Sequence, residues 1–327
     1  MIHRNTIKAL TIFSVTLLLC LLCSRARNTM DTESSRIAFI LDFDGTITQK
    51  DTISTIANFA IAFQKATGKD FADLWKELSD TYIEEYSRFS RGHKPAEQDR
   101  KTLAEEVSYY RNLKSIELAS FARVSKSGIF KEISDAQWRK GGRDAFQKGD
   151  VNVRKGFEDF VKQVGDSKAI WGVVSVNFSS QFIRGVLEAC LGAGAEEVEV
   201  LANHPDKDGI LLGPNSGPVM ATSDAKMVAM NELLQKWRSG SKTSFSKVVY
   251  IGDSGTDIEC LTAEGVKGIV MSTDRESTLI DTLKRLGADL VHIGSLQEGM
   301  RSSVCWARDF EEVVTDPVFN LEAENEA

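Results

Sequence analysis

Short apolar runs separated by polar turns recur along most of this chain. The first is Arg36–Leu41, in which five apolar residues follow the arginine without interruption. Runs of this length are typical of strands that are buried on both faces of a parallel sheet. The same pattern predicts further strands at Ala169–Val174, Val198–Ala202, Lys247–Ile251, Gly268–Met271 and Asp289–Ile293.

Helical periodicity fills the intervals between the later strands. It predicts helices at Gly156–Val164 and Ser179–Leu191. A third helix is expected to reach about Arg238, with Asp224 as its N-cap and Ser223 as an alternative cap. Alternating strands and helices indicate an α/β fold with a doubly wound parallel sheet.

The pattern changes to that of helices alone between Thr52 and about Lys148. Apolar residues such as Ile53 and Ile56 recur there at i, i+3 and i+4 spacing, which predicts an all-helical insert after the first strand. The chain is therefore expected to divide into a leader at 1–35, a core at 36–51 and 150–300, a helical cap at 52–149, and a C-terminal helix with an acidic tail at 301–327.

Composition places the chain among ordinary globular proteins. Of its 327 residues 42% are hydrophobic and 27% are charged, and the formal net charge is -7. A negative chain has no general attraction for nucleic acid, so no nucleic-acid partner is expected. The five cysteines are scattered or lie in an apolar run, and they form no disulfide framework.

The leader is the basic part of the chain. Arg4 and Lys8 precede the apolar stretch Ala9–Cys23, as in the first regions of a signal peptide, but Arg25 and Arg27 follow it directly. The stretch is also short for a membrane span. Three alternatives stay open: a signal, a membrane tether through residues 9–23, or an extension that the folded protein does not use. The expected location is accordingly cytoplasmic, or membrane-anchored or secretory.

The first candidate site residues follow the first strand. Asp42 and Asp44 place two carboxylates one residue apart where a buried strand ends. Like charges so close together are unfavourable unless a cation or a bound proton compensates them. Gly45 allows the backbone to approach an anion closely, and Thr46 offers a hydroxyl donor. An ordinary turn after a strand is the alternative interpretation.

Polar residues also follow two other predicted strands. Ser175 and Asn177 come after one, and Asp253 and Asp257 come after another. Lys226 lies near the start of the helix at Asp224. Carboxylates suit Mg²⁺, which prefers oxygen ligands, and a lysine and a hydroxyl beside it suit phosphate oxygens. Because parallel strands end at one edge of a sheet, we expect a single anion-and-metal site there.

The order of these motifs resembles that of the haloacid dehalogenase superfamily. Asp-Phe-Asp-Gly-Thr, Val-Val-Ser, Asp-Ala-Lys and Gly-Asp-Ser-Gly-Thr-Asp occur in sequence, from about Ile37 to Ile293. Each motif alone is weak, whereas four in order are specific. Within the superfamily the chain is most similar to phosphoserine-phosphatase-like members, which carry a helical cap between the first two motifs.

The resemblance implies a Mg²⁺-dependent phosphatase that hydrolyses a small-molecule phosphomonoester. Asp42 would be the nucleophile that becomes an aspartyl-phosphate, and Asp44 the general acid–base. The metal would be bound by Asp42, the backbone carbonyl of Asp44 and Asp253, with Asp257 supporting that set. A phosphotransferase or phosphomutase of the same superfamily is the alternative, followed by a catalytically silent binding protein.

The resemblance also assigns a phosphate pocket. Ser175 and Lys226 would hold the phosphoryl oxygens, and the backbone around Phe43–Gly45 and Asn177 would complete the pocket. Two positions depart from phosphoserine phosphatases. Asp51 stands where these usually have Glu, and the second-motif serine lacks the usual glycine-rich continuation. Asp51 is therefore a candidate for substrate specificity, and serine is not the expected leaving group.

Overall fold

The central strand of the protein is the first one. The structure is a computed structural model that describes residues 36–167, 169–195, 197–241, 244–274, 277–295 and 303–315. Strand β1 (Arg36–Leu41) pairs in parallel with β2 (Ile170–Ser175) on one side and with β6 (Phe245–Gly252) on the other.

Among the described residues, seven strands form one parallel sheet in the order β3-β2-β1-β6-β7-β9-β8. The outer strands are β3 (Glu199–Ala202), β7 (Val266–Met271), β8 (Val291–His292) and β9 (Val304–Ala307). The prediction of a parallel α/β sheet is confirmed, and a sheet flanked by helices fits the core that the haloacid dehalogenase resemblance implies.

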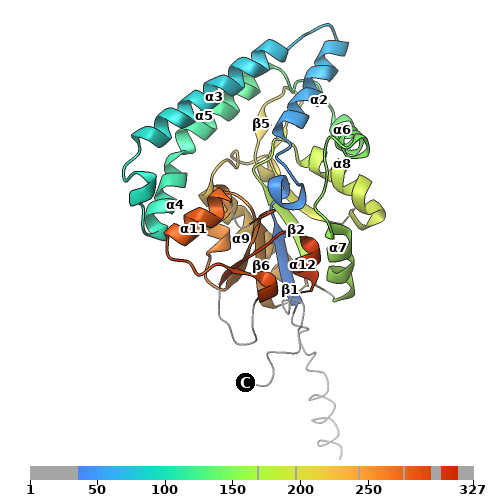
Figure 1. Cartoon of the computed structure of the whole chain (residues 1–327). Helices are drawn as coiled ribbons and strands as arrows, with labels where there is room; N and C mark the ends of the chain where they lie inside the picture. The colour runs from blue at the N-terminus through green and yellow to red at the C-terminus, as the bar shows by residue number, and fades with distance from the viewer. Residues whose placement is uncertain are drawn as a thin grey trace, which may run out of the picture.

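Helices cover both faces of this sheet. Figure 1 shows α7 (Phe157–Asp166), α8 (Ser180–Leu191) and α12 (Phe310–Val314) on one side, and α9 (Ser223–Ser241) and α11 (Thr278–Arg285) on the other. The short α10 (Ile258–Leu261) packs beside α9.

Residues of β1 contribute alternately to two hydrophobic layers. Phe39 packs with Phe160 and Phe310 beneath the first group of helices. Ile40 packs with Leu233 and the other apolar residues beneath the second group. Because both faces are covered, every residue of β1 after Arg36 is at most 1% exposed. This explains the uninterrupted apolar run in the sequence.

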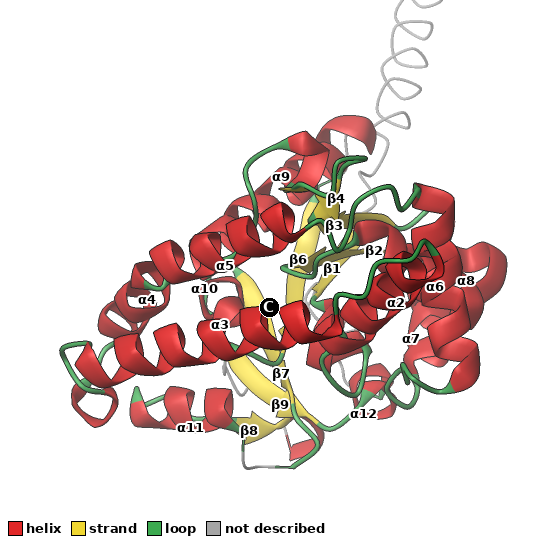
Figure 2. Ribbon diagram, turned by 90° about the horizontal axis from the view of Figure 1, so that it is seen from above, coloured by secondary structure: helices red, strands yellow, loops and turns green. Residues whose placement is uncertain are grey.

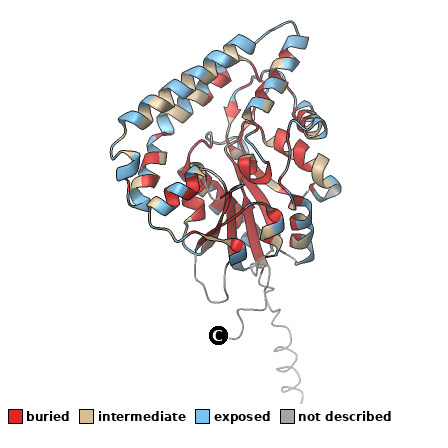
Figure 3. Cartoon of the chain, in the orientation of Figure 1, coloured by how far each residue is buried: buried red, intermediate tan, exposed pale blue. Residues whose placement is uncertain are grey.

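The insert after β1 consists of helices, as predicted from its periodicity. They are α2 (Ile53–Ala66), α3 (Ala72–Gly92), α4 (Leu103–Asn112), α5 (Lys114–Ser127) and α6 (Asp135–Lys148). Helices α3, α4 and α5 form an arm, residues 72–127, that extends from the sheet edge in Figures 1 and 2. The arm is largely exposed, and α3 has no buried residue (Figure 3).

One helix of the insert does not belong to this arm. Helix α6 packs along α8, a helix of the core. The contact is close because Gly142 and Gly185 leave no room for a β-carbon: one at Gly142 would lie 2.1 Å from a carbonyl of Phe182. Helical periodicity identifies an apolar face but not the helix that it meets, so the sequence analysis grouped α6 with the cap.

The core also extends beyond the expected boundary at residue 300. Strand β9 lies inside the sheet between β7 and β8, and the C-terminal α12 packs on α7. Helix α9 begins at Ser223, so Asp224 lies in its first turn instead of capping it.

The remaining short elements connect the larger ones. A hairpin joins β4 (His204–Pro205) to β5 (Leu211–Leu212), and single turns of 3-10 helix lie at Glu97–Asp99, Gly192–Ala195, Pro214–Ser216, Gly255–Asp257 and Ile293–Ser295. The leader at 1–35 and the acidic tail after 315 lie outside the described residues. Within the described ranges, no helix has the length and apolarity that crossing a membrane requires.

Two ion-pair clusters attach the arm to the core. Glu106 of α4 accepts hydrogen bonds from Arg100 and from Arg285 of α11, with its Oε2 at 2.7 and 2.9 Å from the two donors. Glu106 and Arg100 are at most 3% exposed. Arg111 of α4 pairs with Glu259 of α10. The base of the arm is therefore fixed to the helices beside the sheet.

Candidate active site

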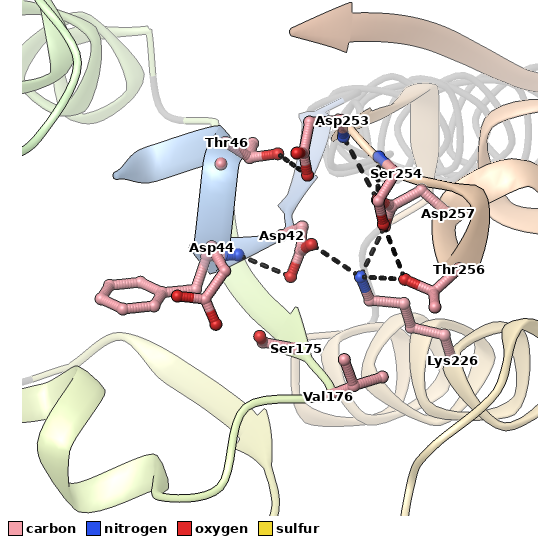
Figure 4. Close-up of polar contacts among 12 residues, drawn as sticks. Asp42, Asp44, Thr46, Ser175, Val176, Lys226, Asp253, Ser254, Thr256 and Asp257 are labelled. Atoms are coloured by element: carbon pink, nitrogen blue, oxygen red, sulfur yellow. Dashed lines mark hydrogen bonds and ion pairs between the residues drawn. The ribbon is translucent and has the colours of Figure 1, made fainter. Parts of the chain in front are cut away.

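Asp42 is placed by the end of β1 and is almost completely buried. One carboxylate oxygen accepts a hydrogen bond from the backbone of Phe43 at 2.7 Å, and the other lies 2.8 Å from Nζ of Lys226. Burial raises the pKa of Asp42 to about 7, although Lys226 opposes the shift. Figure 4 shows its carboxylate facing Lys226 in the centre of the site.

Lys226 reaches this carboxylate from the first turn of α9. Its side chain is completely buried, and Nζ also lies 2.6 Å from Oδ1 of Asp257. Burial alone would lower the pKa of Lys226, but the charges of Asp257 and Asp42 outweigh it and raise the pKa above its usual range. The lysine is therefore cationic, and it contacts two anionic groups from different strand ends.

Both carboxylate oxygens of Asp257 accept hydrogen bonds. Its Oδ1 accepts from Lys226 and, at 2.7 Å, from the hydroxyl of Tyr250. Its Oδ2 accepts from the backbone of Asp253 and Ser254 at 3.2 and 3.0 Å. Through these hydrogen bonds, Asp257 orients Lys226 and the loop of Asp253.

Asp253 completes a cluster of carboxylates suited to a cation. One oxygen from each of Asp42, Asp253 and Asp257 lies within 4.8 Å of the others. Burial, with Asp257 and Asp42 nearby, raises the pKa of Asp253 to about 8. A single lysine cannot offset three clustered carboxylates, two of them buried, whereas a divalent cation bound by oxygen ligands can. The donor set therefore fits Mg²⁺, with Asp42 and Asp253 as the side-chain ligands.

Gly45 makes this close approach possible. Its φ of +68° lies in the left-handed region, and a β-carbon there would lie 2.1 Å from Oδ2 of Asp253. Its N–H donates to Oγ1 of Thr48 at 3.2 Å. Thr46 donates to Oδ1 of Asp253 at 3.3 Å. Both residues thus position Asp253 and the turn, a part that the sequence analysis did not assign to them.

A buried arginine fixes the same turn from behind. Arg154 donates to the carbonyl of Gly45 through Nη2 and Nε, at 2.7 and 3.1 Å, and to the carbonyl of Arg308 through Nη1 at 3.0 Å. It joins the turn after β1, the chain that returns from the insert and the segment after β9. Because Arg154 belongs to no recognisable motif, the sequence gives no sign that it fixes this turn.

Asp44 occupies a separate environment from Asp42. Its Oδ1 accepts from the N–H and hydroxyl of Thr52 at 2.8 and 2.6 Å, and its Oδ2 accepts from Asn177 at 2.7 Å. Burial and the charge of Asp51 raise its pKa to about 6, while the bonds from Thr52 and Asn177 lower it. A carboxyl group that titrates near neutral pH suits acid–base work.

The contacts of Asn177 and Thr52 with Asp44 were not expected from the sequence. Asn177 was assigned to the phosphate pocket, but its amide donates to Asp44 and to Thr52, and its oxygen accepts from Ser179. Thr52 was not recognised, because a threonine before a helix is ordinary.

Ser175 lies where it was expected. It ends β2, which contacts the turn after Asp42, and its hydroxyl oxygen accepts from the N–H of Asn177 at 3.3 Å. The serine is completely buried. Figure 4 shows it below Asp42, with Val176 next to it.

A cavity of about 490 Å³ adjoins this cluster. It lies between the arm and the core, and Asp51, Val176 and Thr256 form part of its lining. Thr256 Oγ1 is 3.5 Å from Lys226 Nζ. Asp51 is exposed, and its carboxylate accepts from the N–H of Ile53 at 2.8 Å. Space for a molecule is therefore present beside Thr256, which contacts Lys226, and beside Val176, which follows Ser175.

Comparison with known proteins gives relatives in two yeasts. A CTO1 family protein of Schizosaccharomyces pombe is 29% identical over 248 residues, covering 72% of this chain and 82% of that protein. Cold tolerance protein 1 of Saccharomyces cerevisiae is 26% identical over 256 residues, covering 73% and 79%. No family model matches the chain.

Solved structures of similar fold include phosphatases. A phospho-aspartyl intermediate analogue of phosphoserine phosphatase is 17% identical and covers 86% of this chain and 99% of its own, with a TM-score of 0.46. Cytosolic 5'-nucleotidase IIIB bound to cytidine is 16% identical, covering 76% and 78%, with a TM-score of 0.48. A Bordetella pertussis protein of unknown function is 17% identical, covering 78% and 97%, with a TM-score of 0.49.

Proposed function

We propose that this protein is a Mg²⁺-dependent phosphatase that hydrolyses a small-molecule phosphomonoester through an aspartyl-phosphate. One observation carries the proposal. Asp42 lies against the buried Lys226 and the metal-suited Asp253, while Asp44 is held apart by Thr52 and Asn177. Two carboxylates in such different surroundings suit two different roles.

The first half-reaction transfers the phosphoryl group to the protein. An oxygen of Asp42 attacks phosphorus, the bond from phosphorus to the ester oxygen breaks, and Asp44 gives its proton to the departing alcohol. Lys226 and Ser175 stabilise the phosphoryl oxygens during transfer. Mg²⁺, when bound by Asp42 and Asp253, supplies positive charge that offsets the phosphate charge.

The second half-reaction regenerates Asp42. Asp44, now ionised, takes a proton from a water molecule as the water oxygen attacks phosphorus. The acyl-phosphate bond breaks, which releases inorganic phosphate and returns the carboxylate of Asp42. Asp44 is then protonated again for the next ester. The fixed position of Asp44 serves both steps, since the same group first donates and then accepts the proton.

Phosphate release from a panel of small phosphomonoesters tests the proposal. We expect release that requires Mg²⁺ and that falls at least about a thousandfold in Asp42→Asn, because the amide is a poor nucleophile. Asp80→Asn is the matched control, since Asp80 is exposed and pairs with Lys76 on α3. Equal activity in Asp42→Asn contradicts the mechanism. Isomerised ester without free phosphate indicates a mutase instead.

Metal binding has a readout that is independent of activity. We expect Mg²⁺ to raise the melting temperature, because a ligand that binds only the folded state stabilises it. The same titration of Asp253→Asn is expected to show a much smaller rise, since it removes a ligand. A melting temperature that does not respond to Mg²⁺ in the unaltered protein contradicts the assignment of the cluster.

A further inference from the structure

The cavity between the arm and the core is positioned to receive the alcohol part of a substrate. Val176 follows Ser175 directly in the chain, and Thr256 directly precedes Asp257, so the residues at its floor adjoin the proposed phosphate site. An ester whose phosphate lies at Asp42 therefore extends its other end into this cavity. This reasoning rests on the proposed function.

The walls of the cavity are mainly apolar and aromatic. Trp75 and Tyr82 line it from α3, Phe121 from α5, and Phe178 from the chain after β2. The rings of Phe121 and Phe178 meet edge to face with centroids 5.0 Å apart. Each of the two is 7% exposed, so they form a fixed wall.

The charges in the cavity all have one sign. Among the described residues that line it, Asp51 and Glu117 are acidic, and none is lysine, arginine or histidine. Glu117 accepts a hydrogen bond from the hydroxyl of Tyr82 at 2.9 Å. Burial raises the pKa of Glu117 to about 6, although the bond from Tyr82 opposes the shift. The cavity therefore has two acidic side chains and, among the described residues that line it, no cation to neutralise them.

We propose that the leaving alcohol of the substrate is an organic cation with an apolar body. Its positive group would be attracted by Glu117 and Asp51 and by the faces of the surrounding aromatic rings. Its apolar part would cover Phe121 and Phe178. A leaving group with a carboxylate or a second phosphate would instead meet two like charges without a compensating base.

Three esters of matched length test the preference: 6-aminohexyl phosphate, hexyl phosphate and 5-carboxypentyl phosphate. They present a cation, no charge and an anion at the far end of one aliphatic chain. With the whole protein and Mg²⁺, we expect kcat/KM to fall in that order, by about tenfold or more at each step.

Variants of the two acids identify the source of the preference. In Glu117→Gln and in Asp51→Asn the ratio of kcat/KM for the amino ester to that for the hexyl ester is expected to fall about tenfold. Turnover of the hexyl ester itself should change little in Glu117→Gln. In Asp51→Asn only the ratio is compared, because the charge of Asp51 also acts on the pKa of Asp44. Glu84→Gln is the matched control, because Glu84 is an exposed acid of α3 that pairs with Arg88 outside the cavity. Melting temperatures confirm that each variant is folded.

The outcomes separate this proposal from the one on which it rests. Equal kcat/KM for the three esters, or a preference for the carboxylate, overturns the cationic leaving group and leaves the phosphatase in place. A preference that persists unchanged in both acid variants also overturns it. If none of the esters, nor p-nitrophenyl phosphate, releases phosphate with Mg²⁺, the proposed function itself fails and this inference with it.

Discussion

Asp42 and Asp44 are chemically identical, and their partners separate them. A lysine and two further carboxylates surround Asp42, whereas Asp44 accepts three hydrogen bonds from Thr52 and Asn177. These donors fix the orientation of Asp44, because its two oxygens are bound from different elements. Thr52 and Asn177 thus position Asp44, and on the proposed function they would act on the substrate only through it.

Thr52→Val tests this positioning. The valine keeps the shape of threonine but loses the hydroxyl that donates to Asp44 at 2.6 Å. We expect kcat to fall about 10- to 100-fold, as for other groups that orient a reacting residue, while KM changes little. Thr52→Ser retains the hydroxyl and should recover most of the rate. If Thr52 had only a structural role, Thr52→Val would lower the melting temperature, and Thr52→Ser would not restore kcat.

Gly45 provides a test of the close approach between the turn and Asp253. Gly45→Ala is expected to abolish phosphate release and to lower stability, because its β-carbon would overlap Asp253. Gly68→Ala is the control. Gly68 also has a positive φ, at +90°, but nothing lies within 4 Å of its β-carbon, so the change should cost only about 1 kcal/mol of backbone strain. Urea unfolding and phosphate release measure both effects.

The pKa of Glu117 predicts a pH dependence of substrate choice. Glu117 is ionised above about pH 6 and neutral below it, and Tyr82 and Asp51 are the other titratable groups of the same cavity. The preference for 6-aminohexyl over hexyl phosphate should therefore be full above pH 6 and weaken as the pH falls through 6. Both esters carry the same phosphate, so its ionisation cancels in the ratio. In Glu117→Gln this step should be absent.

At the scale of elements, the position of the arm depends more on the ion pairs at its base than on contacts along its length. Helix α3 has no buried residue, and α4 is tied to α11 through Glu106, Arg100 and Arg285. A buried acid with two cationic partners is costly to disturb, because its removal leaves those charges unpaired. This cluster therefore contributes more to holding the arm in place than the exposed pairs along α3.

Glu106→Gln is expected to lower the free energy of unfolding by about 3 kcal/mol, since Arg100 and Arg285 would lose their counter-charge in a buried place. Glu84→Gln, which removes an exposed pair with Arg88, should change stability by less than about 1 kcal/mol. Urea unfolding of the two variants compares them directly. A similar small loss in both would show that the cluster does not stabilise the arm.

The sequence predicts most strands of the sheet and misses one. Strands such as β1 are buried on both faces, and this leaves a continuous apolar run. Strand β9 was missed although it is as long as β3, because the chain after residue 300 was assigned to a helix and a tail. The packing of α6 against α8 was also missed, since it depends on which helices meet.

The residues of the candidate site also differ in how clearly the sequence marks them. The sequence marks Asp42, Ser175 and Asp253 because they stand at strand ends in recognisable motifs, and Lys226 because it lies near the start of a helix. Residues that orient them, such as Thr52, act through contacts between distant segments and have ordinary neighbours in the sequence. Such residues become visible only when the fold brings their partners together.

At the scale of the whole molecule, the candidate site residues lie together at the carboxyl ends of the parallel strands. The insert lines the cavity beside them. The turn after β1 supplies Asp42 and Asp44, and β6 leads to Asp253. The two ends of the insert meet there, and the backbone N–H of Gln49 donates to the carbonyl of Asn152 at 2.8 Å. On the proposed function, one unit of the chain would select the alcohol part of the substrate and another would process its phosphate.

The contact of Arg154 with both Gly45 and Arg308 has a consequence for shortened forms of the protein. A chain that stopped before β9, through a premature stop codon or proteolysis, would retain all of the motif residues. It would nevertheless lose the carbonyl of Arg308, one of the acceptors that fix the guanidinium behind the turn after Asp42. Such a product would therefore be judged intact from its motifs although the support of this turn is incomplete.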